Sequence, residues 1–231
     1  MKKIKFIAIF MMLMLCLCFA FVACTPDGTG DGNGNNNNGT LEDNNGSGND
    51  NGSNNTPSAE KILIAFFSRA DENYSVGYIE KGNTHIIAEI IAEYTDGELF
   101  HIERSTPYPK VYSECTEEAQ REKNANARPK LLADIDITEY DTIFLGYPNW
   151  WGDMPMPVYT FIESHNWNGK TVIPFCTNAG SGLSNTVSTL RSKLSGATVL
   201  NGLAIAGTTA QNNRTASDKA VSDFLKGIGL I

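Results

Sequence analysis

Short apolar runs alternate with amphipathic or polar segments along most of the chain. The runs have the length and composition of buried strands and lie at residues 61–67, 99–102, 141–146, 171–176 and 198–205. The segments between and after them predict helices at residues 84–94, 112–126, 155–164, 183–194 and 217–226. This alternation predicts an α/β fold with a doubly wound parallel sheet and helices on both of its faces. Pro174, inside the fourth run, argues against a strand there, because proline cannot donate a hydrogen bond to a neighbouring strand.

The carboxyl ends of parallel strands meet at one edge of the sheet, and α/β proteins bind their ligands at that edge. The loops that follow the first, third and fourth predicted strands therefore form the expected site. These loops lie at residues 68–84, 146–157 and 177–182.

The loop after the third strand carries two adjacent tryptophans, Trp150 and Trp151. Neighbouring side chains of a strand point to opposite faces, so the two indoles cannot both continue into one core. The prolines and glycines around them also end any regular element there. Large apolar residues at the rim of a sheet suit a large flat aromatic ligand, and a planar cofactor is the first hypothesis.

The loop after the first strand begins with Ser68 and Arg69 and ends with Gly82, Asn83 and Thr84 at the start of a helix. Hydroxyl groups, a glycine and the free N–H groups of a helix N-terminus form an anion site, which the helix dipole strengthens. Capping of the helix by Asn83 or Thr84 is the other interpretation, and it leaves Ser68 and Arg69 unexplained. The loop has neither the lysine of a P-loop nor the glycine fingerprint of dinucleotide-binding folds.

The loop after the fourth strand consists of small polar residues and glycines. Such residues let the backbone approach a ligand closely, although loops of this composition are common. The loop lacks the G-x-S-x-G pattern of a nucleophile elbow. The three histidines, His85, His101 and His165, have no metal-ligand spacing, so no metal site is predicted.

Taken in order along the chain, these motifs resemble the flavodoxin family. They are Ser68-Arg69, Gly82-Asn83-Thr84, the segment 146–152 and the segment 175–182. The similarity is strongest to the bacterial flavodoxin-like proteins with a paired-tryptophan loop, and it spans about residues 60–231. It implies a flavodoxin-like doubly wound sheet of five parallel strands in the order 2-1-3-4-5, three layers of structure, and noncovalent binding of FMN at the strand ends.

The resemblance also implies roles for individual residues. Those expected to hold the FMN phosphate are Ser68, Arg69, Asn83 and Thr84. Those expected to line the isoalloxazine ring are Pro148, Asn149, Trp150, Trp151 and Gly152. Those expected at the other edge of the ring are Thr177, Asn178, Gly180, Ser181 and Gly182. No catalytic acid or base is assigned.

The chain departs from the family pattern between Ala70 and Gly82, which the short family pattern joins almost directly. Residues 71–81 enlarge this phosphate loop, and Tyr74 or Tyr78 could fold over the ribityl chain or the flavin. The sequence leaves open which residues of the enlarged loop contact FMN.

The N-terminal residues have the pattern of an export signal. Three lysines precede an apolar run at residues 6–22, and a small residue comes before Cys24. This pattern predicts a lipoprotein-type signal peptide at residues 1–23 and lipidation of Cys24. An uncleaved membrane anchor is the alternative, because the run approaches the length that spans a bilayer. Either interpretation places the remaining chain on the extracytoplasmic face of a bacterial membrane.

Residues 24–59, rich in asparagine and glycine, predict a disordered tether, because they cannot bury enough apolar surface to offset the entropy of ordering. Residues 60–231 then form the flavodoxin-like domain. The chain has 18 basic and 26 acidic residues and a net charge of −8. Loss of residues 1–23 removes three lysines, which leaves 15 basic residues and a charge of −11. Such an acidic protein disfavours nucleic acid as a partner.

Two cysteines, Cys115 and Cys176, lie beyond the signal and Cys24. They show neither metal-binding spacing nor the even framework of a disulfide-rich protein. In an exported protein they can form one disulfide, or they can both be buried thiols, and spacing does not decide between these states.

Together these features predict an FMN-binding redox protein that works outside the cytoplasm, by electron transfer or by NAD(P)H/quinone-type reduction. Its partner would be a redox protein or a small-molecule acceptor, with the membrane reached through the lipid anchor and the oligomeric state open. The alternative is a surface-anchored ligand-binding module that kept the fold and lost the cofactor. A phosphoacceptor receiver domain would need clustered aspartates after the first and third strands. The chain has Ser68 and Gly146-Tyr147 at these positions, so this alternative is rejected.

Overall fold

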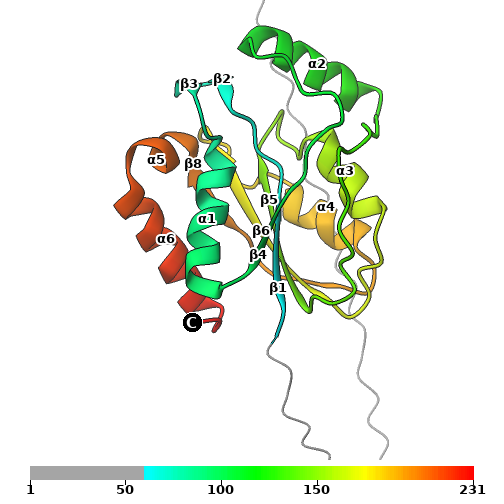
Figure 1. Ribbon diagram of the computed structural model, residues 1–231, viewed down its shortest axis with the longest axis vertical. Helices are drawn as coiled ribbons and strands as arrows, with labels where there is room; N and C mark the ends of the chain where they lie inside the picture. Colours follow the sequence, from blue (N-terminus) through cyan, green and yellow to red (C-terminus); the bar gives the residue numbers. More distant parts are fainter. Residues whose placement is uncertain (1–59) are drawn as a thin grey trace, which may run out of the picture. The chain divides into compact units, whose positions relative to one another are not determined.

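A central parallel sheet organises the part of the chain that the computed structural model describes, residues 60–231 (Figure 1). The main sheet contains β1 (Ile62–Phe66), β4 (Glu98–His101), β5 (Thr142–Pro148), β6 (Thr171–Asn178), β7 (Thr198–Val199) and β8 (Leu203–Ala206). The predicted signal peptide (1–23), with Cys24 and the tether (24–59), lies outside the described residues.

The strands follow the order β4-β1-β5-β6, and β7 and β8 both pair with β6 at the fifth position. All of these pairings are parallel. The predicted order 2-1-3-4-5 is therefore confirmed, with the last strand in two pieces.

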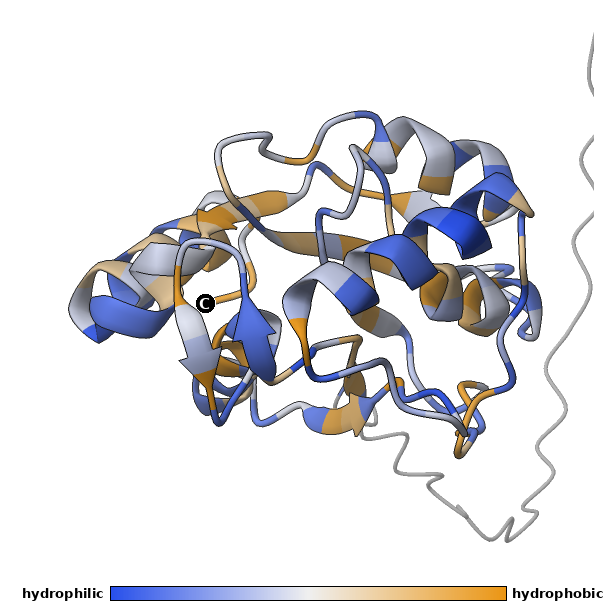
Figure 2. Cartoon of the chain, turned by 90° about the horizontal axis from the view of Figure 1, so that it is seen from above, coloured by the Kyte–Doolittle hydropathy of each residue, from blue (hydrophilic) through white to orange (hydrophobic). Residues whose placement is uncertain are grey.

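Helices on both faces of the sheet give the three predicted layers. The helices are α1 (Asn83–Thr95), α2 (Tyr112–Asn124), α3 (Met156–Glu163), α4 (Thr186–Lys193), α5 (Gly207–Asn212) and α6 (Arg214–Gly227). Alternate residues of β1 enter different cores, since Leu63 packs with α2, α3 and α4 whereas Ile64 packs with α1, α5 and α6. Figure 2 shows the apolar colour concentrated on strands of the main sheet, while the helices carry polar surface.

Pro174 lies inside β6 despite the objection raised by its missing N–H. It is opposite Leu145 of β5, and its carbonyl oxygen is close to Gly202 on the other side. β7 ends at Val199 and β8 begins at Leu203, so the fifth strand is broken beside Pro174. In a parallel strand, the N–H and the C=O of one residue point toward the same neighbouring strand. The missing N–H of Pro174 is therefore on the side of the break between β7 and β8, where no hydrogen bond of the sheet is needed.

The insertion at residues 71–81 forms a small hairpin, which the sequence pattern did not predict. Its strands are β2 (Asp71–Asn73) and β3 (Gly77–Ile79), and they pair antiparallel. Asp71, Ser75 and Gly77 have positive φ angles of 64°, 64° and 70°. The strands are only three residues long, so the hairpin has no hydrophobic alternation by which a sequence search would find it.

The two cysteines of the domain are free and buried, so they form no disulfide. Burial raises the pKa of Cys115 to about 11 and that of Cys176 to about 12. Both therefore remain protonated thiols near neutral pH. Within residues 60–231, no helix combines the length and apolar character needed to cross a membrane.

Candidate functional site

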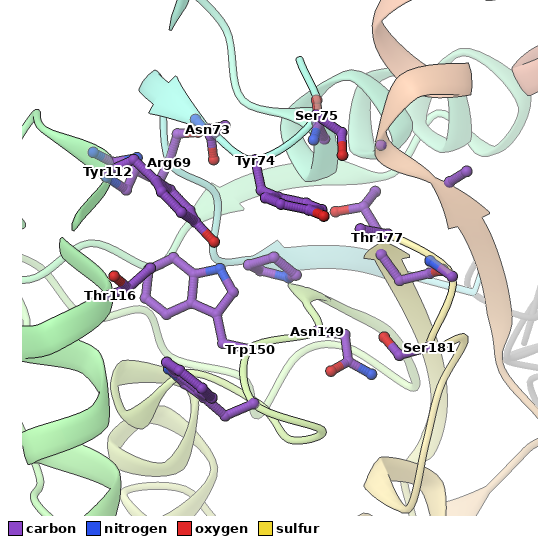
Figure 3. Close-up of a pocket in the computed structure, with 18 of the residues that line it drawn as sticks. Arg69, Asn73, Tyr74, Ser75, Tyr112, Thr116, Asn149, Trp150, Thr177 and Ser181 are labelled. Carbon is purple, nitrogen blue, oxygen red and sulfur yellow. Dashed lines mark hydrogen bonds between the residues drawn. The ribbon is translucent and has the colours of Figure 1, made fainter. Parts of the chain in front are cut away.

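A cavity of about 530 Å³ opens at the carboxyl edge of β1, β5 and β6, where the sequence predicts the ligand site (Figure 3). Its walls come from the loops after these strands, the β2–β3 hairpin and the starts of α1, α2 and α5. The predicted site residues that line it are Arg69, Asn83, Pro148, Asn149, Trp150, Trp151, Thr177, Asn178, Gly180 and Ser181. The four others, Ser68, Thr84, Gly152 and Gly182, lie outside this lining.

Ser68 and Thr84 join the loops that form one end of the cavity. The Ser68 hydroxyl accepts a hydrogen bond of 3.1 Å from the His85 backbone N–H, in the first turn of α1. The Thr84 hydroxyl lies 2.8 Å from the Thr177 hydroxyl and is buried. These two side chains therefore hold the helix start against the neighbouring loops.

Asn83 is the first residue of α1, and its side chain lines the cavity. Its Oδ1 is buried without a hydrogen-bond partner among the described residues. The first N–H groups of a helix also lack partners within the helix, and the dipole makes this end positive. A ligand group with both acceptor and donor capacity, such as a phosphate ester bearing hydroxyls, would satisfy this end of the cavity.

Arg69 lines the cavity, but its terminal nitrogens are already engaged. They donate to the backbone carbonyls of Glu72 at 2.5 Å, Pro109 at 2.6 Å and Lys110 at 2.7 Å. The side chain thereby ties the hairpin to the segment that precedes α2. Its Nε is buried and has no partner within the described part of the chain, which leaves one donor for a ligand.

The two tryptophans diverge, as the sequence argument requires. Trp150 is half-buried and meets Phe67 and Tyr108 edge-on, with ring centroids 5.4 and 5.2 Å apart. Trp151 is 55% exposed and has a φ of 58°, followed by Gly152 at 74°. Two successive positive φ angles give a type I′ turn, and this turn aims the indoles in different directions.

The turn is held by both backbone and side-chain bonds. Trp150 and Asp153 exchange backbone hydrogen bonds of 2.9 and 3.1 Å. Lys123, from α2, donates to the Trp151 carbonyl at 2.6 Å and lies 3.7 Å from the Asp153 carboxylate. Gly152 therefore serves the turn, and α2 fixes its position.

The opposite loop, residues 178–182, is joined to the tryptophan loop by Asn149. The Asn149 side chain donates to the Gly182 carbonyl at 2.8 Å, and its backbone N–H donates to the Thr177 carbonyl at 2.8 Å. A Cβ at Gly180 would meet nothing within 4 Å, so the backbone there is accessible, and its φ of 109° is one that glycine adopts without strain. The three loops thus form one connected frame around the cavity.

Sequence reasoning missed several lining residues. They belong to the hairpin, to α2 and to the start of α5, and include Asn73, Ser75, Tyr112, Thr116, Gly207 and Thr208. Tyr74 also lines the cavity, as the sequence allowed, whereas Tyr78 does not. The sequence feature that could have identified Tyr112 is its position, as an aromatic residue at the start of a mostly polar helix.

The family model described as Flavodoxin matches residues 61–219. The chain belongs to the flavodoxin family. The match covers every element of the main sheet and all three loops of the cavity. The family assignment therefore applies to the part of the chain that contains both the sheet and the cavity at its strand ends.

Solved structures of flavoproteins resemble this flavodoxin. A candidate flavoprotein from Bacteroides eggerthii is 28% identical, with a TM-score of 0.59 over 74% of this chain and 99% of that one. A candidate flavoprotein from Bacteroides uniformis is 28% identical, with a TM-score of 0.57 over 71% and 98%. A Lactobacillus acidophilus flavoprotein in complex with FMN is 26% identical, with a TM-score of 0.52 over 65% and 95%. A comparison with curated proteins found no match.

Proposed function

We propose that this flavodoxin binds FMN and acts as a redox protein, either as an electron carrier or as a reductase of small acceptors. The observation that carries the proposal is the cavity itself, which runs from the start of α1 to the paired-tryptophan turn. The similarity to a flavoprotein in complex with FMN supports the same ligand. FMN, when bound, supplies the electron-transfer chemistry, and the protein supplies binding, orientation and tuning.

The residues present fit the two ends of FMN. At the α1 end, Asn83 Oδ1 is a buried polar atom without a partner among the described residues, beside the positive end of the helix dipole. Arg69 Nε is a second such atom, on a side chain held where the hairpin meets the segment before α2. At the other end, Trp150 and the loop that contains Gly180 offer an aromatic wall and accessible backbone. These residues would hold the phosphate and ribityl chain at one end and border the ring at the other.

The full chain, stripped of bound flavin, is expected to bind FMN with a Kd of about 1 μM or tighter. Riboflavin, which lacks the phosphate, should bind at least about tenfold more weakly, because the α1 end would then be unused. Quenching of flavin fluorescence measures both affinities. Absence of FMN binding would favour the alternative of a binding module that has lost its cofactor.

We further propose that the protein is a lipoprotein of the paired-tryptophan branch, held outside the cytoplasm by Cys24. The signal pattern before Cys24 supports the anchor, and Trp150 and Trp151 support the branch. Such a protein would donate electrons to, or accept them from, a redox protein or a small molecule on that side of the membrane.

Cys24→Ala is expected to abolish incorporation of labelled palmitate. Cys18→Ala is the matched control, since it alters a cysteine six residues away within the apolar run. Fractionation and labelling of cells that express each variant measure the effect. If Cys24→Ala stays in the membrane and the wild type takes up no label, the uncleaved anchor is correct instead.

A further inference from the structure

Two tyrosines that belong to neither end of the proposed cofactor site line the same cavity. Tyr74 lies in the turn of the β2–β3 hairpin, and Tyr112 is the first residue of α2. Their ring centroids are 6.1 Å apart, with an angle of 33° between the ring planes. Both rings retain access to solvent, since Tyr74 is 64% and Tyr112 is 37% exposed. A pair of accessible aromatic rings in a cavity wall is a stacking surface for a further ring.

The two tyrosines are brought together by specific contacts. The Glu72 carboxylate accepts a 2.8 Å hydrogen bond from the Tyr112 backbone N–H, and the Glu72 N–H donates to the Lys110 carbonyl at 3.3 Å. Arg69 adds its hydrogen bonds to the carbonyls on both sides of this junction. The hairpin and the start of α2 therefore form one wall, which the inserted residues 71–81 make possible.

This wall faces the tryptophan loop across the cavity. Figure 3 shows Tyr74 and Tyr112 on one side of the cavity, with Trp150 and Asn149 on the other. Tyr74 comes from the hairpin inserted into the loop after β1, and Tyr112 comes from α2, so both lie on elements outside the main sheet. The tyrosine wall thus consists of the inserted hairpin and the start of α2, and it opens into the same space as the strand-end loops.

The charge of the cavity indicates what kind of ring the wall accepts. Among the described lining residues, Arg69 is the one cationic side chain, and no carboxylate accompanies it. Its terminal nitrogens donate to backbone carbonyls, so Nε is its one remaining donor, and the described lining offers no second cationic side chain to an anionic dinucleotide. Burial raises the pKa of Tyr112, so its hydroxyl stays protonated and can donate a hydrogen bond. An uncharged ring with carbonyl oxygens matches these properties.

We propose that Tyr74 and Tyr112 form the binding subsite for an uncharged planar acceptor of the quinone class. The proposal rests on the proposed function, in which FMN occupies the rest of the cavity. FMN, when bound and fully reduced, would supply the two electrons and two protons that convert a quinone to a quinol. The tyrosines orient the acceptor ring, and both line a cavity that a small ring can enter and a folded partner protein cannot.

The test uses the full chain loaded with FMN and menadione as the probe. In Tyr74→Leu/Tyr112→Leu the Kd of menadione for the oxidised holoprotein, measured by calorimetry, is expected to rise about tenfold, because two stacking contacts are lost. The ratio of menadione to ferricyanide reduction by dithionite-reduced protein should fall by a similar factor. Tyr74→Phe keeps its ring and should retain most of the affinity.

Tyr78→Leu is the matched control, because Tyr78 lies in the same hairpin, is 69% exposed and does not line the cavity. It should leave menadione binding unchanged. The proposal is overturned if the double variant binds menadione as the wild type does. It is also overturned if the double variant loses FMN affinity instead, since the tyrosines would then belong to the cofactor site. The FMN titration of the wild type is done before any menadione is added. If the wild type does not bind FMN, both the proposed function and this subsite are wrong.

Discussion

Trp150→Ala is expected to lower the affinity of the protein for FMN by about a hundredfold, which corresponds to roughly 2.7 kcal/mol. Trp150 forms the wall of the cavity at the end assigned to the flavin ring, and its indole is held edge-on by Phe67 and Tyr108. Truncation of an aromatic anchor in a binding site typically costs at least about 2 kcal/mol of binding free energy, which is the range expected for this half-buried wall. The loss includes the stacking surface and the exclusion of water from the ring.

Trp151→Ala is the matched control, because the neighbouring indole lies on the same turn but is 55% exposed. It should weaken FMN binding by about tenfold or less, in line with the smaller surface that it can bury. Flavin titration well below the unfolding temperature of each variant separates binding from stability. Equal losses in the two variants, or a larger loss in Trp151→Ala, would contradict the assignment of Trp150 as the principal wall.

The fold followed from the sequence because its strands are uninterrupted apolar runs. A strand buried on both faces, such as β5, cannot be confused with a surface element, and its neighbours in the chain are separated by helix-length segments. Once the alternation is recognised, the right-handed crossover rule leaves few sheet orders. The end of the chain was harder, since the predicted strand at 198–205 is broken and an added short helix, α5, precedes α6.

The site was predicted where a loop directly follows a strand, and less well elsewhere. Trp150 and Asn149 are within a few residues of β5, so the topology alone brings them to the cavity. Tyr112 reaches the cavity through a contact between α2 and the hairpin, which are far apart in the sequence and have no periodic signal linking them. Arg69 shows the other limit, because residue type indicates a charge but not the three carbonyls that already engage it.

Gly146→Ala is expected to destabilise the domain by about 3 kcal/mol, which lowers its Tm by roughly 6–12 °C. Gly146 lies in β5 opposite Phe175 of β6. A Cβ at this position would come within 2.1 to 2.6 Å of three atoms of the Phe175 ring. Phe175 is fully buried between the strands and the α1 face of the core, so the ring cannot move aside without disturbing its neighbours.

Gly227→Ala is the matched control, because Gly227 ends α6 and a Cβ there meets nothing within 4 Å. Its stability should stay within about 1 kcal/mol of the wild type. Thermal unfolding is measured without added FMN, since a ligand that binds only the folded state raises its apparent stability. Phe175→Leu in the Gly146→Ala background should recover part of the loss, and the double-mutant cycle isolates the contact. If the effects of Gly146→Ala and Phe175→Leu on the free energy of unfolding are additive, the Phe175 ring does not set the requirement for glycine. Strong coupling between them would show that packing against Phe175 in the core requires glycine at position 146, just before the tryptophan loop.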